Sequence, residues 1–286
     1  MKRTETLPED ERANQPHRTP EVIRRISSAV VLGAVALIAT LYAPWSFLLL
    51  VLVCGALLVW EWGRTTRGDG LDGTALISVA SIAVIAIFIF VHRPALAAAS
   101  FAVAAAAIGL FATPKHHFGW AVAGLAYAVV PASALVWLRG DPALGALAVI
   151  YLFTVAWTTD TASYGAGRLI GGPKLAPRVS PQKTWSGFIV GALAPALVGV
   201  AFAFALQRSS AAILALVSVG LALACQAGDL TESWIKRRFG IKDMSQLIPG
   251  HGGLADRIDG LLFAAVAGGL IALRDPDNPG SALLIW

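Results

Sequence analysis

The chain has 286 residues, of which 57% are hydrophobic and only 14% charged, and its mean hydropathy is +0.70. Soluble globular domains carry about 25% charged residues, so the composition excludes an ordinary soluble domain and indicates a membrane protein. The net charge of +5 does not by itself indicate nucleic acid, because cytoplasmic loops of membrane proteins also carry a basic excess. No basic stripe interleaved with aromatic residues is present, so we expect no nucleic-acid partner.

The N-terminal 22 residues are polar, with mixed charge and three prolines. Such a segment cannot bury a core, and it predicts a disordered cytosolic tail over residues 1–22. We expect residues 23–286 to form a single transmembrane catalytic domain.

Apolar runs of about 20 residues are long enough to cross a bilayer as helices, and helix is the structure that satisfies the backbone within each segment. The candidate runs are Ile26–Tyr42, Ser46–Trp62, Thr74–Val91, Ala95–Ala112, Trp120–Leu138, Ala143–Thr159, Gly187–Leu206, Ala211–Gly228 and Ile258–Leu273. The expected fold is therefore an all-α polytopic bundle of about nine spans. Pro131 and Pro195 fall inside spans and predict kinks there.

The distribution of Lys and Arg predicts the orientation of these spans. With the N-terminus inside and nine spans, only Arg93, Arg139, Arg208 and Arg274 fall in outside segments. All other Lys and Arg residues then fall in the tail or in the inside segments. This bias predicts a cytosolic N-terminus and places the two unusual polar loops, residues 160–186 and 229–259, on the cytosolic side.

The chemistry is expected in the polar stretch from Gln226 to Asp259. If the eighth span continues as a helix, Asp229, Ser233 and Lys236 share one face. The run over residues 248–253, Ile-Pro-Gly-His-Gly-Gly, cannot be a regular helix. The last span then begins near two further carboxylates.

Several of these residues also have purely structural explanations. Asp256 and Asp259 are favourable charges at a helix N-terminus. Basic anchors at the membrane surface are the structural explanation for Lys236, Arg237 and Arg238, and it fits Arg238 better than Lys236. The structural explanation for His251 is a cap of the turn.

The glycine pair suits a backbone that approaches a ligand closely, and exposed N–H groups at a helix N-terminus suit phosphate. Carboxylates beside Lys, Arg and a Gly-rich turn fit a divalent cation held between protein and polyphosphate. Mg²⁺ prefers such oxygen ligands, and it stabilises charge when pyrophosphate leaves a phosphorus atom.

The stretch from Ser233 to Asp259 resembles the signature of the phosphatidate cytidylyltransferases, the CDP-diacylglycerol synthases. The matching positions are Ser233, Lys236, Arg237, Lys242, Asp243, His251, Gly252, Gly253, Asp256, Arg257 and Asp259. The resemblance continues upstream through Gly228–Leu230 and residues 160–187, so the active site is expected within about residues 151–275. It implies transfer of a cytidylyl group from CTP to phosphatidic acid, giving CDP-diacylglycerol and pyrophosphate, with Mg²⁺ as cofactor.

The resemblance also implies residue roles. One or two Mg²⁺ ions are expected on Asp229 and Asp256, with Asp160 as a weaker third ligand. Catalytic roles are expected for Asp229, Asp256, Lys236 and Ser233. Substrate-binding roles are expected for Arg237, Lys242, Asp243, His251, Gly252, Gly253, Arg257, Asp259, Ser180, Lys183 and Thr184. Because a phosphate monoester is already ionised near neutral pH, no general base is required, and His251 is not assigned as one.

The other polar loop fits the same interpretation, with Asp160 at the end of the sixth span and a turn over residues 180–184 before the seventh. The family more often has a second lysine where Gln182 stands and an acid where Ser186 stands. Lys183 is therefore the expected phosphate contact, and roles for Gln182 and Ser186 are in doubt.

Two other functions remain open at this point. One is a different membrane enzyme, such as a CTP-dependent lipid kinase or a cytidylyltransferase for ether lipids. The other is a lipid or anion transporter, although charges near the bilayer midplane would then be expected. The enzyme interpretation predicts an integral protein of the bacterial inner membrane, facing the cytosol; a homodimer is left open.

Overall fold

The structure is a computed structural model that describes residues 19–111, 118–248 and 252–286. Its helices are α2 (Thr19–Tyr42), α3 (Pro44–Arg67), α4 (Gly73–Phe90), α5 (Pro94–Phe111), α6 (Phe118–Arg139), α7 (Gly145–Leu169), α8 (Trp185–Leu193), α9 (Ala196–Leu206), α10 (Ala211–Arg238), α11 (Ala255–Ala272) and α12 (Pro279–Leu284). A two-stranded antiparallel hairpin, β1 (Lys174–Ala176) and β2 (Ser180–Thr184), separates α7 from α8.

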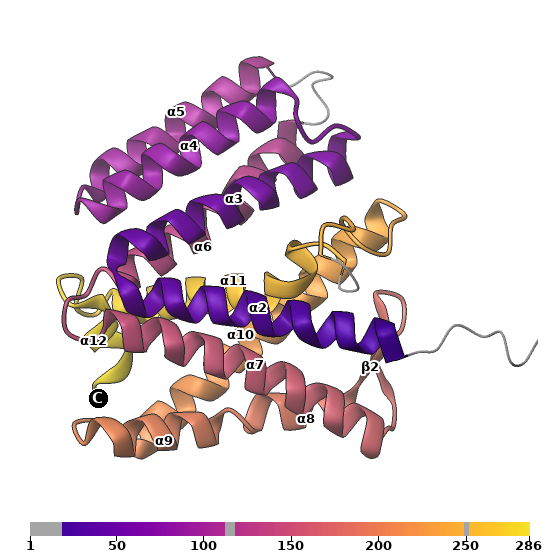
Figure 1. The fold of residues 1–286 in the computed structure, drawn as a ribbon, viewed down its shortest axis with the longest axis vertical. Coiled ribbons are helices and arrows are strands. Elements are labelled where there is room, and N and C mark those ends of the chain that lie inside the picture. Colours follow the sequence, from indigo (N-terminus) through magenta and orange to yellow (C-terminus); the bar gives the residue numbers. More distant parts are fainter. Residues whose placement is uncertain (1–18, 112–117, 249–251) are drawn as a thin grey trace, which may run out of the picture.

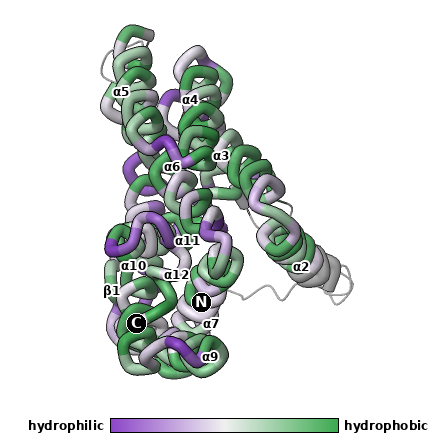
Figure 2. Tube along the Cα trace, turned by 90° about the vertical axis from the view of Figure 1, so that its left-hand side faces the viewer, coloured by the Kyte–Doolittle hydropathy of each residue, from purple (hydrophilic) through white to green (hydrophobic). Residues whose placement is uncertain are grey.

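Every predicted apolar run overlaps helix in the described residues, and the described part of the chain is mostly helical as expected. Within the described residues, six helical stretches are long and apolar enough to cross a membrane: α3, α4, α6, α7, the α8–α9 pair and α10. The apolar parts of α2 and α5 are shorter, and α11 carries three charges in its first turns. Figure 2 shows that most of the helical trace is hydrophobic and that strongly hydrophilic residues occupy short stretches.

Three local features differ from the predicted runs and turn. The helices of the sixth and eighth predicted spans extend beyond the apolar runs Ala143–Thr159 and Ala211–Gly228: α7 continues to Leu169 and α10 to Arg238, the latter as considered for Asp229, Ser233 and Lys236. Residues 180–184 form strand β2 rather than a turn, because they pair with β1: Thr184 lies opposite Lys174, and Ser180 lies opposite Ala176. The fold is thus helical with one small hairpin.

The two prolines inside predicted spans behave differently. The seventh span is interrupted beside Pro195, where α8 ends and α9 begins, as a residue without an N–H predicts. Pro131 lies inside the uninterrupted helix α6.

The expected N-terminal tail lies largely outside the described residues. Helix α2 begins at Thr19, so the last four residues of the tail predicted over 1–22 are helical.

The helices form an elongated bundle, with α4 and α5 side by side at one end and α8 and α9 at the other (Figure 1). Two clusters of buried apolar side chains stabilise it, and helices α3, α6, α10 and α11 contribute to both. The start of α2, the hairpin and the end of α10 lie on one side of the bundle, whereas α12 and the C-terminus lie on the opposite side (Figure 1).

Candidate active site

The site is centred on the crossing of α10 and α11, which approach closely through two glycines. A Cβ at Gly228 would lie 2.4 Å from the backbone oxygen of Asp259, and a Cβ at Gly260 would lie 3.4 Å from Oδ1 of Asp229. Larger residues would separate the helices. Because neither glycine has a side chain, the two helices approach closely enough for the carboxylates of Asp229 and Asp259 to lie near each other.

About two turns further along α10, a lysine lies between two carboxylates. The ammonium of Lys236 is 2.5 Å from Oε2 of Glu232 and 2.7 Å from Oδ1 of Asp256. The side chains of Glu232 and Asp256 are almost fully buried, at 2% and 4% exposure. Buried carboxylates need such a partner, so Lys236 joins α10 to the first turn of α11.

The hairpin contributes a second lysine to the site. Lys183 on β2 donates to Oδ2 of Asp229 at 2.6 Å. Its neighbour Thr184 is the N-cap of α8 and accepts the N–H of Gly187, the preferred role of threonine at a helix start. The cap fixes the end of β2, and hence the direction from which Lys183 reaches α10.

In the glycine-rich turn, the N–H groups that the structure describes are paired within the protein, and a role of Gly252 and Gly253 in binding phosphate stays a prediction. The N–H of Gly252 pairs with the Ile248 carbonyl, and the N–H of Gly253 donates to Oδ2 of Asp256 at 2.8 Å. The next two N–H groups, of Leu254 and Ala255, donate to the carboxylate of Glu61 on α3.

The two glycines meet backbone and steric requirements. Gly252 has φ of +87°, a conformation that L side chains rarely adopt. A Cβ at Gly253 would lie 2.6 Å from Oε1 of Glu61 and 2.9 Å from Oδ2 of Asp256. Asp256 also accepts the N–H of Met244 at 3.1 Å. It therefore holds both Met244 and Gly253 next to the first turn of α11.

The remaining predicted site residues lie around this centre. Arg237 makes long contacts, at 3.4 and 3.5 Å, to the carbonyls of Val179 and Ile241. Lys242 and Asp243 are exposed directly after α10, and Ser233 and Ser180 are half-buried. His251 lies outside the described residues.

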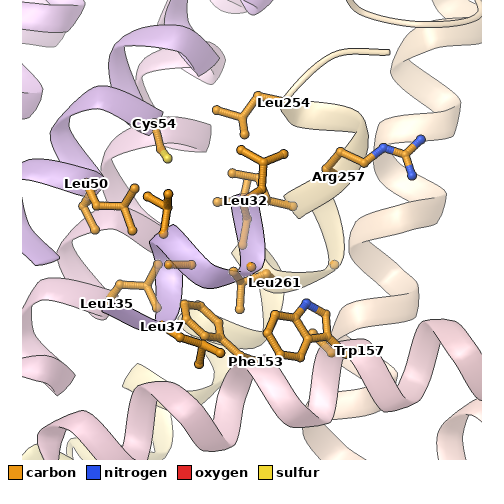
Figure 3. A pocket seen from close by; sticks show the side chains of 18 of the residues that line it. Leu32, Leu37, Leu50, Cys54, Leu135, Phe153, Trp157, Leu254, Arg257 and Leu261 are labelled. Carbon is orange, nitrogen blue, oxygen red and sulfur yellow. The ribbon is translucent and has the colours of Figure 1, made fainter. Parts of the chain in front are cut away.

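Two cavities meet at Asp160 on α7. The larger, of about 790 Å³, is lined mainly by apolar side chains of α2, α3, α6, α7 and α11, with Asp160 and Arg257 among its few polar groups. Figure 3 shows Arg257 at the opposite side of this cavity from Leu50 and Leu135. The smaller, of about 390 Å³, is polar, and Asp160, Lys183 and Asp229 line it.

The donor chemistry of the site fits a divalent cation, although no group of three His, Cys, Asp or Glu side chains within the described ranges is gathered closely enough to hold one. The carboxylates of Asp160, Asp229 and Asp259 repel one another. Oε1 of Glu232 is buried without a hydrogen-bond partner in the described part of the chain. Carboxylates thus outnumber cations, which suits a hard ion with oxygen ligands.

Comparison with known proteins agrees with the signature. The model of the cytidylyltransferase family matches residues 23–272. The chain belongs to the cytidylyltransferase family. Over 261 residues it is 40% identical to a phosphatidate cytidylyltransferase of Brucella suis biovar 1 (strain 1330), covering 90% of this chain and 96% of the relative. It is 41% identical over 241 residues to the Brucella abortus biovar 1 (strain 9-941) protein of the same name, covering 84% and 89% of the two chains.

A further match covers less than half of each chain. A phosphatidate cytidylyltransferase of Haemophilus influenzae is 44% identical over 131 residues, covering 43% of this chain and 45% of the relative.

Three polar residues of this cytidylyltransferase-family site were not predicted from the sequence. Glu61 and Glu232 are ionisable residues in or beside apolar spans, a signal that by itself marks a functional position. Tyr127 on α6 has a buried hydroxyl without a hydrogen-bond partner among the described residues, and it interacts electrostatically with Asp229, Glu232 and the carboxylates of α11. The i, i+3 spacing of Asp229 and Glu232 on a continuing helix could have indicated the second acid.

Proposed function

We propose that this protein transfers a cytidylyl group from CTP to phosphatidic acid and releases CDP-diacylglycerol and pyrophosphate. The observation that carries the proposal is the meeting of an apolar and a polar cavity at Asp160, beside the acidic crossing of α10 and α11. A lipid phosphate and a nucleotide need such neighbouring spaces. The chain's membership of the cytidylyltransferase family and its relatives named phosphatidate cytidylyltransferase support the same reaction.

In the proposed reaction an oxygen of the phosphatidate phosphate attacks the α-phosphorus of CTP. A new P–O bond forms, and the bond from the α-phosphorus to the oxygen that bridges to the β-phosphorus breaks. Pyrophosphate carries away that electron pair. The attacking phosphate is already ionised at neutral pH, since the second pKa of a phosphate monoester is about 6, so no general base is needed.

Mg²⁺ belongs to the proposal, and when bound it supplies positive charge that stabilises the transferring phosphoryl group. We assign it to Asp229 and Asp160, because both carboxylates line the polar cavity. Asp256 is a less suitable ligand, since both of its oxygens already accept hydrogen bonds, from Lys236 and from two backbone N–H groups. We assign Asp256 to fixing Lys236 and the turn.

The cations that face the cavities are assigned to phosphates. Lys183 lines the polar cavity beside Asp229, and Arg257 lines the apolar cavity near Asp160. Their positions suit the triphosphate and the lipid phosphate, respectively. Arg237 and Lys242, exposed at the end of α10, are assigned to guiding the nucleotide towards the site.

We propose nine spans with the N-terminus and the active site facing the cytosol, in a bacterial inner membrane. The support is that α2, α3, α4, α5, α6, α7, the α8–α9 pair, α10 and α11 run alternately between the two sides of the bundle (Figure 1). The basic residues after α7 and α10 lie on the side where α2 begins, in agreement with the positive-inside rule. CTP is cytosolic, and a site on this side reaches both it and the lipid headgroup.

The test uses the full chain purified in detergent, radiolabelled CTP, phosphatidate micelles and Mg²⁺. We expect labelled CDP-diacylglycerol and an equal amount of pyrophosphate, and loss of both when EDTA removes the metal. Asp229→Asn should lower turnover at least about 100-fold. The matched control is Asp277→Asn, an exposed acid after α11, which should keep wild-type turnover.

The outcomes separate this function from its alternatives. Release of CDP with a phosphorylated lipid would indicate a CTP-dependent kinase. Absence of any product from folded wild-type protein would refute the proposed transfer. Wild-type turnover by Asp229→Asn would refute the metal assignment alone.

A further inference from the structure

Glu61 is a buried acid in the N-terminal half, on a helix that the signature does not include. It lies on α3 between two tryptophans in an otherwise apolar stretch, and it is 0% exposed. Burying a carboxylate in such a place is costly unless it is compensated by hydrogen bonds or charge. Its partners therefore indicate what the residue does.

All the recorded partners of Glu61 belong to the turn that leads into α11. Oε1 accepts the Ser245 hydroxyl at 2.5 Å and the Leu254 N–H at 2.8 Å. Oε2 accepts the Ala255 N–H at 2.7 Å. The residue at the N-cap of α11, Leu254, supplies no side-chain cap of its own. Glu61 therefore caps α11 from another helix, where the helix dipole favours an anion.

The carboxylate of Glu61 lies close to that of Asp256, with Gly253 beside both. Gly253 lies between the two acids, because a Cβ there would be 2.6 Å from Glu61 and 2.9 Å from Asp256. Asp256 in turn holds Lys236. A displacement of the α11 N-terminus away from Glu61 would thus move Asp256 and Lys236, and with them the acid-lined end of α10.

We propose that Glu61 is a positioning residue for the cytidylyl transfer. It fixes Ser245 and the first turn of α11 from the N-terminal half, and so gives the N-terminal spans a role in the geometry of the site. This inference rests on the proposed function, since the quantity that it sets is the rate of that transfer. Glu61 itself lines neither of the two cavities, so it is not assigned a contact with substrate.

The test compares Glu61→Gln with Thr66→Ala in the full chain in detergent. Glutamine keeps the shape of Glu61 but loses its charge and replaces one acceptor oxygen by a donor facing a backbone N–H. Thr66 is a matched buried residue of α3 whose hydroxyl bonds only its own helix, at the Trp62 carbonyl. We expect Glu61→Gln to lower kcat about 10- to 100-fold, as loss of a supporting contact does, and Thr66→Ala to keep the wild-type kcat and KM.

Two further readouts separate positioning from loss of folded protein. Hydrogen exchange at the Leu254 and Ala255 amides should accelerate in Glu61→Gln while exchange in α7 and α9 stays at the wild-type rate. The KM for CTP should rise in the folded fraction, whereas partial unfolding would lower the apparent kcat with KM unchanged. Ser245→Ala, which removes one of the three donors, should produce smaller changes in the same direction.

Wild-type kcat, KM and amide exchange in Glu61→Gln would overturn the proposal. A kcat loss fully accounted for by less folded protein would overturn it as well. If Glu61→Gln does not fold, unchanged exchange and kinetics in Ser245→Ala overturn it. A wild-type protein that forms no CDP-diacylglycerol refutes the proposed function instead, and the exchange experiment still reports on the capping contact.

Discussion

Replacing Gly228 by alanine should impair the site without changing any of its polar side chains. Gly228 lies where α10 crosses α11, one residue before Asp229, and its Cα faces the backbone of Asp259. An alanine Cβ built there lies 2.4 Å from the Asp259 oxygen, 3.0 Å from its carbonyl carbon and 3.1 Å from the Phe263 ring. Two of these atoms belong to backbone, so they cannot rotate away.

The size of the effect follows from these distances. Ordinary contact needs about 3.4 Å, so the two helices must separate by about 1 Å at the crossing. Overpacking of this kind costs about 1–3 kcal/mol of stability, and a 1 Å misplacement of reacting groups costs about 100-fold in rate. We therefore expect Gly228→Ala to fold with lower stability and to lose about 100-fold in kcat.

The assay is CDP-diacylglycerol formation at saturating CTP, together with an unfolding curve in detergent. Gly220→Ala is the matched control, because it lies on the same helix and a Cβ there meets nothing within 4 Å. The unfolding midpoint of this control should be slightly higher than that of the wild type, because alanine stabilises a helix by about 0.5–1 kcal/mol relative to glycine. The control should also keep full activity. Equal kcat in Gly228→Ala and Gly220→Ala would refute the close-crossing argument.

Three further predictions concern stability, each followed through unfolding in detergent. Lys236→Met should cost about 3–5 kcal/mol because it leaves the carboxylates of Glu232 and Asp256 buried without their cation, whereas Lys242→Met, at an exposed lysine, should change nothing. Gly252→Ala should cost about 1–2 kcal/mol because φ is +87° there; an unchanged midpoint would contradict the strained conformation. Burial opposes ionisation of Asp141, but hydrogen bonds from the N–H groups of Leu144, Ser281 and Ala143 outweigh it and lower the pKa of Asp141. The ionised side chain therefore contributes its full free energy to folding above about pH 4. This contribution is lost as the pH falls through the lowered pKa. Asp141→Asn should remove about 1–3 kcal/mol at pH 7 and little at acid pH, and an equal difference at both pH values would argue against an ionised Asp141.

Hydropathy predicted where helices lie, because every apolar run must satisfy its backbone internally. It did not predict where α7 and α10 end, because polar residues do not stop a helix once it leaves the hydrocarbon region. The better stop signals were the glycines: Gly171 and Gly172 follow α7, and Gly240 follows α10, all with positive φ. The hairpin escaped prediction since strands of three and five residues, one with a proline, give almost no periodic signal.

The contacts of the site were less predictable than its composition. The signature singled out Lys236 and Asp256, and the resemblance just upstream of it added Asp229; the structure pairs Lys236 and Asp256 directly. The signature could not indicate that Gly253 accommodates Glu61, because that contact joins positions 192 residues apart, one in α3 and one in the turn before α11, and the sequence does not place these two segments relative to each other. An acid within an apolar span was the one available hint of this contact. The interpretation of the glycines as a phosphate cradle stays a prediction, and the structure adds that their N–H groups bond Ile248 and Asp256.

Metal dependence stays a prediction, and the charge balance of the site supports it independently of any relative. Both proposed substrates are anions, and they must approach a place where carboxylates of α7, α10 and α11 outnumber the lysines and arginine beside them. Lys183 and Lys236 already face Asp229, Glu232 and Asp256, so little of their charge remains to balance a triphosphate. Without added positive charge the nucleotide would be repelled at the distances involved. The acid-rich geometry therefore favours a divalent cation bound together with CTP, and it predicts that raising Mg²⁺ lowers the KM for CTP until the nucleotide is fully complexed.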